Sequence, residues 1–219
     1  MGTLSSGKML SVRLSADELN KILPADVSLA AINSTTLSVV AGTHEAIANF
    51  SELLKAKEVP YKALATSHAF HSYMMDELLT PFESFAATVT YKEPLLPIAS
   101  TVTGKWLQSS EAMSPAYWAK HMRSTVQFVP AIQLLVEEAY DLFVEIGPGS
   151  SVSTFTRQLT VGKDITVVTS LEKPESLLPS RQAIHRALGQ LWMQGYAPDW
   201  TAYYENYKKR KLQDLPTYA

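Results

Sequence analysis

The chain lacks cysteine altogether in its 219 residues. That absence excludes disulfides, thiolate zinc sites, iron–sulfur clusters and a cysteine nucleophile. The chain also lacks an excess of either charge, because 19 Lys and Arg are set against 21 Asp and Glu. This balance gives no electrostatic reason to expect nucleic acid or an anionic membrane as a partner.

Long apolar runs are absent as well. No segment approaches the roughly 18 consecutive apolar residues that a membrane-spanning helix needs. The N-terminus, "MGTLSSGKML", does not have the basic-then-apolar order of a signal peptide. We therefore expect a cytoplasmic protein, and the 46% of hydrophobic residues predict a substantial core. The basic run "KKRK" at 208–211 is typical of a solvated surface or linker.

The first 65 residues alternate between strand and helix patterns. Ser15 followed by Glu18 predicts a capping box, and Thr43 predicts a second helix start. Asn33 is most simply a residue of the polar turn between two strands. We expect helices over 15–23 and from Thr43 to Pro60, and strands over 8–14, 27–34, 36–43 and 61–65. The order β-α-β-β-α-β is ferredoxin-like.

The rest of the chain predicts an α/β fold with parallel strands. We expect one kinked helix or two short ones over 73–88, since Thr80-Pro81 resembles a helix start. Further helices are expected over 115–122, 129–139, 151–159 and 179–195. The last of these should turn Ile184, Leu188, Leu191 and Trp192 inward. Strands are expected over 97–102, 141–146 and 164–171. The last two are apolar enough to be buried on both faces, as in a parallel sheet. Three strands are few for a doubly wound domain, and this small number suggests that part of the sheet comes from elsewhere.

Two of the five histidines, His68 and His71, lie in "SHAFHSYMMD" between a strand and a helix. A metal pair would need further ligands, and no Glu, Asp or Cys has a suitable spacing, so no metal site is expected. An imidazole beside a helix that begins at Ser72 or Tyr73 would stay neutral near pH 7, as a general base must. Spacing alone favours two ordinary, partly exposed loop histidines.

The glycine-rich segment "EIGPGSS" at 145–151 lies between a strand and a helix. It can hold an anion through its backbone N–H groups, or it can simply open a helix. Ser150 follows a Gly-Pro-Gly turn, but the chain contains no G-x-S-x-G nucleophile elbow. We find no residue suited to covalent catalysis.

Taken together, these segments resemble the acyltransferase domain of modular polyketide synthases, related to malonyl-CoA:acyl-carrier-protein transacylases. The resemblance runs from residue 7 to 218 through "GKMLSVRLS", "AAINSTTLSVVAG", "TSHAFHSYMMDELLTPF", "STVTGKWL", "YWAKHMRSTVQF", "FVEIGPGSSVS", "GQLWMQGYAPDW" and "LPTY". It implies a ferredoxin-like subdomain at 7–66, the C-terminal part of an α/β-hydrolase-like core at 67–195 and a post-acyltransferase linker at 196–219.

The resemblance also implies residue roles. His71 would be the base that deprotonates a serine, which attacks the thioester of malonyl-CoA. The malonyl group would then pass to the phosphopantetheine thiol of an acyl carrier protein, with no permanently bound cofactor. His68, Ala69 and Phe70 would form the extender-unit pocket, since "HAFH" resembles the malonyl-selecting version and Phe70 fills the space of an α-methyl group. Asn33 and Gln127 would line the site or orient the imidazole.

Three parts that the resemblance implies are missing from the chain: the G-H-S-x-G serine, the glutamine loop with its oxyanion donor, and the arginine that pairs with malonyl. We therefore expect that the chain begins within the domain and is inactive alone. Its expected partners are the acyl carrier protein, the remaining N-terminal segment and the neighbouring ketosynthase domain. Two alternatives stay open, a split acyltransferase and a non-catalytic binding or docking module.

Overall fold

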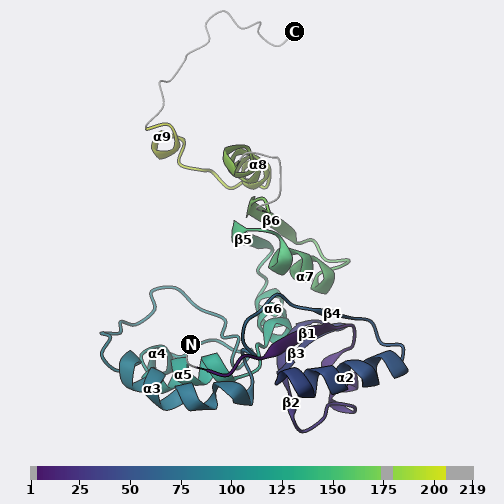
Figure 1. Ribbon diagram of the computed structural model, residues 1–219. Coiled ribbons are helices and arrows are strands. Elements are labelled where there is room, and N and C mark those ends of the chain that lie inside the picture. Colours follow the sequence, from purple (N-terminus) through teal and green to yellow (C-terminus); the bar gives the residue numbers. More distant parts are fainter. Residues whose placement is uncertain (1–3, 174–179, 206–219) are drawn as a thin grey trace, which may run out of the picture. The chain divides into compact units, whose positions relative to one another are not determined.

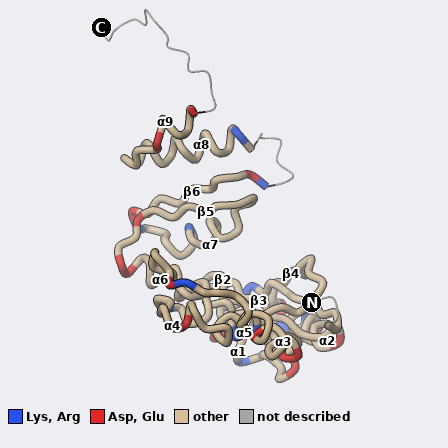
Figure 2. The backbone as a smooth tube through the Cα atoms, turned by 90° about the vertical axis from the view of Figure 1, so that its left-hand side faces the viewer, with Lys and Arg blue, Asp and Glu red and all other residues tan. Residues whose placement is uncertain are grey.

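The computed structural model describes residues 4–173 and 180–205 (Figure 1). Its internal contacts divide the chain into two compact units. The first unit comprises Met1–Asp141 with Thr154–Ile165, and the second comprises Leu142–Ser153 with Thr166–Ala219. Figure 2 shows Lys and Arg interspersed with Asp and Glu along the described chain, as the balanced composition predicts.

The first unit contains the expected ferredoxin-like sheet. Its elements are β1 (Lys8–Val12), α1 (Ala16–Asn20), β2 (Val27–Ser34), β3 (Leu37–Gly42), α2 (His44–Ala56) and β4 (Tyr61–Ala63). The strands are antiparallel and follow the order β2-β3-β1-β4. The predicted caps are confirmed, because the Ser15 and Thr43 side chains accept hydrogen bonds from the first turns of α1 and α2. Asn33 is not in the turn as predicted: it lies within β2, at a register shift.

Both faces of this sheet are covered, which follows from the alternation of side chains along its strands. Leu10, Val40 and Phe50 belong to a core cluster on the face against which α1 and α2 pack. Met9 and Ala41 point the other way, into a second cluster that includes Ala69. The loop that carries the two histidines therefore packs directly on the sheet.

Helices follow the sheet in the first unit. They are a 3₁₀ turn η1 (Tyr73–Met75), α3 (Asp76–Ala86), α4 (Ser109–Ala112), α5 (Pro115–Arg123) and α6 (Phe128–Glu137), and α3 packs against α5 (Figure 1). The helical segment expected over 73–88 is confirmed as η1 followed directly by α3, whereas a second helix start at Thr80 is wrong, since α3 contains Pro81. The predicted strand over 97–102 is also wrong. Ala99 forms only an isolated bridge with Trp106, because the chain turns back around Ser100.

Elements β5 (Leu142–Pro148), α7 (Ser151–Leu159), β6 (Thr166–Leu171), α8 (Ser180–Met193) and α9 (Trp200–Tyr203) complete the described chain. Strands β5 and β6 pair in parallel, as expected, and α8 packs on β6. Full burial of β5 was predicted and is wrong, since Ile146 is 89% exposed. Packed helices bury the faces of parallel strands, and Ile146 has no such cover among the described residues.

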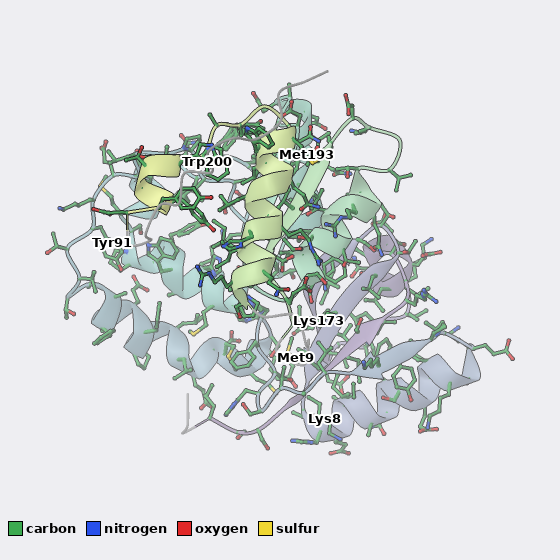
Figure 3. All side chains as sticks on the ribbon, turned by 90° about the horizontal axis from the view of Figure 1, so that it is seen from above. Lys8, Met9, Tyr91, Lys173, Met193 and Trp200 are labelled. Atoms are coloured by element: carbon green, nitrogen blue, oxygen red, sulfur yellow. The ribbon has the colours of Figure 1, made fainter. Side chains whose placement is uncertain are left out.

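The face of α8 also differs from the prediction. Its buried residues are Ala183 and Ala187, whereas Ile184 and Trp192 are exposed. Met193 at the end of this helix is exposed as well (Figure 3). Among the described residues, no helix is both long and apolar enough to span a bilayer. The "KKRK" run and the tail of the expected linker lie outside the described residues, and the cytoplasmic location and the boundaries 7–66, 67–195 and 196–219 stay predictions.

Candidate functional site

The loop around His71 is pinned by a buried serine. Ser72 is fully buried, and its hydroxyl donates to the carbonyl oxygen of Ala69 at 2.6 Å. The same oxygen atom of Ser72 accepts from the backbone N–H of Met74 at 3.2 Å. Ala69 is itself fully buried on the sheet. These contacts fix the backbone on both sides of His71.

His71 itself adopts a left-handed backbone conformation, with φ of 56°. This region is unfavourable for residues other than glycine, although histidine enters it more readily than most. Such a conformation persists only where the surroundings determine it, and it concentrates at functional sites. Here the hydrogen bonds of Ser72 hold the turn, so the His71 ring leaves the loop in a defined direction.

The protonation pattern of His71 follows from one hydrogen bond. Its Nδ1 lies 2.9 Å from the carbonyl oxygen of Ser124. A carbonyl oxygen only accepts, so Nδ1 carries the hydrogen and donates it. In the neutral ring, Nε2 therefore keeps its lone pair. This is the tautomer that a general base needs.

The carbonyl group that orients His71 is fixed by the sheet. Ser124 follows the end of α5 in extended conformation. Immediately after it, the Thr125 hydroxyl donates to the carbonyl oxygen of Leu29 at 2.6 Å. Val126 then forms a parallel bridge with Ala31, and its N–H donates to the carbonyl oxygen of Ala30 at 2.8 Å. The segment 124–126 is thus attached along the edge of β2.

A second histidine, His121, lies beside His71. The two ring centroids are 6.4 Å apart and the planes are inclined by 66°. The rings of Tyr117 and Trp118 lie 6.3 Å and 6.1 Å from His121. Its Nε2 lies 3.3 Å from the hydroxyl oxygen of Thr101, which completes the enclosure.

The "STVTG" turn at 100–104 contacts residues of α5 and α6. The buried Ser100 hydroxyl lies 2.7 Å from the Tyr117 hydroxyl. The carbonyl oxygen of Thr101 accepts from the N–H of Gln127 at 2.7 Å. Gly104 has φ of 67°, and a Cβ atom built there would lie 2.4 Å from Cβ of Pro130. The turn therefore needs glycine at this position.

The pKa of His71 lies below the ordinary histidine value, chiefly because the ring is partly buried. The hydrogen bond to the Ser124 carbonyl acts in the opposite direction, and the charge of His121 lowers the pKa further. The sequence predicted a helix dipole as the cause of neutrality. A helical segment does begin directly after Ser72, as η1 followed by α3, and the contribution of its dipole stays a prediction.

Two of the other predicted site residues, His68 and Phe70, belong to the same loop as His71. His68 Nδ1 lies 2.9 Å from the hydroxyl oxygen of Ser67, and its ring lies 6.0 Å from that of Phe70. Phe70 is partly buried and packs against the same cluster as Ala69. Gln127 precedes α6 as its N-cap residue. Within residues 4–173 and 180–205, no hydrogen bond joins the side chain of Asn33 or Gln127 to His71.

The glycine-rich segment at 145–151 itself contains an anionic side chain, that of Glu145, which accepts a hydrogen bond from the N-terminus of α7. Gly147 and Gly149 have positive φ values, and their N–H groups donate to Ser170 Oγ and to the Glu172 carbonyl oxygen. The N–H of Ser153, in the first turn of α7, donates to the carboxylate of Glu145 at 2.9 Å. The carboxylate of Glu145 thus accepts from one of the backbone N–H groups that were expected to hold an anion. No group of three or more His, Asp or Glu suited to a metal ion occurs in the part of the chain that the structure describes.

Ser124 and His121 are the residues of this site that sequence patterns did not indicate. Ser124 contributes a backbone carbonyl 53 positions from His71, and a backbone group leaves no sequence signal. His121 does have one, since it follows Tyr117 by four residues on a helix and so shares its face. Its proximity to His71 depends on how α5 packs.

Known proteins share this arrangement of elements. Residues 1–194 match the family model described as acyl transferase domain. The chain is 31% identical over 219 residues to the polyketide synthase GfsA of Streptomyces halstedii, covering 98% of this chain and 3% of GfsA. The acyl transferase domain of ZmaA is 32% identical with a TM-score of 0.87, covering 99% of this chain and 50% of that one.

A further solved relative is the acyl transferase domain of SpnD in complex with 2-(pent-4-yn-1-yl)malonyl. It is 32% identical with a TM-score of 0.84, and the match covers 87% of this chain and 47% of that one. The chain thus spans about half the length of these two solved domains. Because the family match includes most of the chain, the chain belongs to the acyl transferase domain family and is of the kind found in modular polyketide synthases.

Proposed function

We propose that this chain provides the base and the extender-unit pocket of a malonyl transferase. In the complete domain, Nε2 of His71 would take the proton of a serine hydroxyl as that oxygen attacks the thioester of malonyl-CoA. His71 would return this proton to the sulfur of coenzyme A as the thiol leaves, so that malonyl-serine forms and the ring is neutral again. His71 would then accept the proton of the phosphopantetheine thiol of an acyl carrier protein as its sulfur takes the malonyl group.

The observation that carries this proposal is the tautomer of His71. The carbonyl oxygen of Ser124 holds the hydrogen on Nδ1, and burial lowers the pKa of the ring. A neutral imidazole with a free Nε2 lone pair can remove a hydroxyl proton near pH 7, whereas an imidazolium cannot. The acyltransferase family supports the same role for this ring.

The serine, the oxyanion donors and the malonyl-binding arginine would come from the remaining N-terminal segment of the domain. The exposure of β5 supports this part of the proposal, since Val144 is 39% and Ile146 is 89% exposed on a strand of parallel type. Such strands are usually covered on both faces. A neighbouring ketosynthase domain and an acyl carrier protein would be the further partners.

Malonyl selection would rest on His68, Ala69 and Phe70. Phe70 is partly buried against the cluster that contains Ala69, so its ring has little freedom to move aside for an α-methyl group. Asn33 and Gln127 are proposed as residues near the pocket. The malonyl derivative bound to the SpnD domain supports a malonyl-type substrate.

Mass spectrometry of the intact protein tests the proposal. The chain alone, incubated with malonyl-CoA, should gain no malonyl mass. After a verified complex forms with a polypeptide carrying the N-terminal segment, the serine of that segment should gain it. His71→Ala in this complex should lose most of the transfer, while His185→Ala should not. A malonyl adduct on the isolated chain, or full transfer by the His71→Ala complex, would overturn it.

A docking module is the competing function. It requires a partner whose binding does not depend on the base. His71→Ala separates the two functions, because docking survives the substitution whereas acyl transfer does not.

A further inference from the structure

Among the side chains around His71, one titratable neighbour is not required by the base mechanism. His121 belongs to α5, and its ring lies edge-on to that of His71 at 6.4 Å between centroids. It is partly buried, with the rings of Tyr117 and Trp118 and the hydroxyl of Thr101 beside it. These contacts leave the ring little freedom, so its distance from His71 is set by the fold.

We propose that His121 is a positioning residue for His71: its imidazole, held edge-on to the base, opposes the addition of a proton to the His71 ring through its own positive charge. The proposal rests on the proposed function only in treating His71 as the base. The electrostatic coupling itself is a property of this chain.

Two positive charges at this separation repel, and partial burial reduces the screening by water. Histidine changes its charge between about pH 5 and pH 8, which is where a base must remain neutral. A protonated His121 therefore makes a second proton on His71 less favourable. The lowered pKa of His71 agrees, since the charge of His121 is among its causes.

Other charged groups near His71 do not account for this effect. On the elements around His71 these groups are His68 and Tyr73 in its own segment, Asp76 and Glu77 in α3, and Lys120 and Arg123 in α5. Strand β2 carries none. Asp76 and Arg123 form an ion pair and largely cancel each other. Among the described residues, it is instead the charge of His121 that lowers the pKa of His71, while the backbone of His121, like that of Ser124, raises it.

The test is an NMR titration of the histidine ring signals in the full chain. His71→Gln identifies the His71 signal by its loss. In His121→Gln, whose amide can still bond to the Thr101 hydroxyl, the titration midpoint of His71 should move upward, toward the ordinary histidine value. In the matched control His68→Gln, which removes a histidine from the same loop, the midpoint should stay where it is.

An unchanged or lowered His71 midpoint in a folded His121→Gln protein would overturn the proposal. If His121→Gln disturbs the backbone spectrum, His121→Asn provides the same neutral charge with a smaller side chain, and the same two outcomes apply. A purely structural role of His121 would broaden signals without this directional shift.

The electrostatic coupling of His121 to His71 and the proposed role of His71 as base can be disproved independently of each other. Transfer by the complemented His71→Ala enzyme would remove His71 as the base, while an upward shift in His121→Gln would still establish the coupling. Conversely, loss of transfer in His71→Ala with no shift in His121→Gln would keep the base and remove the role of His121.

Discussion

Nδ1 of His71 donates a hydrogen bond to the carbonyl oxygen of Ser124 at 2.9 Å. One bond thus joins a loop that packs on the ferredoxin-like sheet to the end of α5, and it defines which nitrogen of His71 is free. Four predictions follow from the groups that hold this ring and the turns beside it.

His71→Gln should weaken the dependence of stability on pH. The folded pKa of His71 lies below the ordinary value, which is about 6.5 in an unfolded chain. Between these two values the unfolded state binds more protons, so the free energy of unfolding falls as the pH falls through that window. His71→Gln should lose this contribution, and urea unfolding at several pH values measures it. His68→Gln should keep it; an equal loss there would contradict the assignment to His71.

Ser72→Ala should destabilise the first unit by about 1–3 kcal/mol. The substitution leaves the Ala69 carbonyl and the Met74 N–H without the buried hydroxyl that satisfies both. Hydrogen exchange of the amides in β1 and β3 measures the loss. Ser51→Ala is the control, because Ser51 bonds only to a carbonyl of its own helix, and it should change stability by less than about 0.5 kcal/mol. Equal effects of the two variants would contradict a special role for Ser72.

Gly104→Ala should destabilise the "STVTG" turn by more than about 1 kcal/mol, since alanine would enter a left-handed conformation and its Cβ would lie 2.4 Å from that of Pro130. Gly189→Ala is the opposite case. It lies in α8 with no atom within 4 Å of an added Cβ, so a gain of about 0.5–1 kcal/mol is expected there. Hydrogen exchange reports each unit separately. A neutral Gly104→Ala would show that the turn can shift.

Phe70→Ser should relax the discrimination between malonyl and methylmalonyl in the complemented enzyme. Removing the ring opens space for an α-methyl group, and one methylene in a pocket changes selectivity by about 10- to 200-fold. Competition between the two coenzyme A esters, read by the mass of the acylated serine, gives the ratio. Phe70→Met keeps most of the volume and should keep most of the preference. If both variants retain the wild-type ratio, Phe70 is not part of the pocket.

Local signals predicted several helices and strands well. Strand β2 spans Val27–Ser34 and α7 spans Ser151–Leu159 as expected, and Ser15 and Thr43 cap their helices. Caps and alternation are determined by neighbours in the chain, so they are visible in the sequence.

The errors arose where distant contacts override local preference. Thr80-Pro81 has the composition of a helix start, yet α3 runs through it because its residues pack against α5. Residues 97–102 have strand composition, but Ser100 turns the chain toward Tyr117. The exposed face of α8 was misjudged because Ala183 and Ala187, the smaller residues, let the helix approach β6.

For the same reason, the sequence indicated only some of the residues of the candidate site. His71 stood out through its motif, and its role as base came from the family resemblance. Its hydrogen-bond partner is a backbone group, and its electrostatic neighbour His121 lies on a helix 50 positions away. Such proximity is set by packing and not by spacing.

The bridge between Val126 and Ala31 has a consequence for motion. Because the Ser124 carbonyl belongs to the same segment, fraying of the β2 edge would weaken the hydrogen bond that favours one tautomer of His71. The rotation of the base would then follow the opening rate of a sheet edge. The proposed base would therefore depend on backbone pairing for its orientation, and amide exchange at Val126 would measure how often that pairing opens.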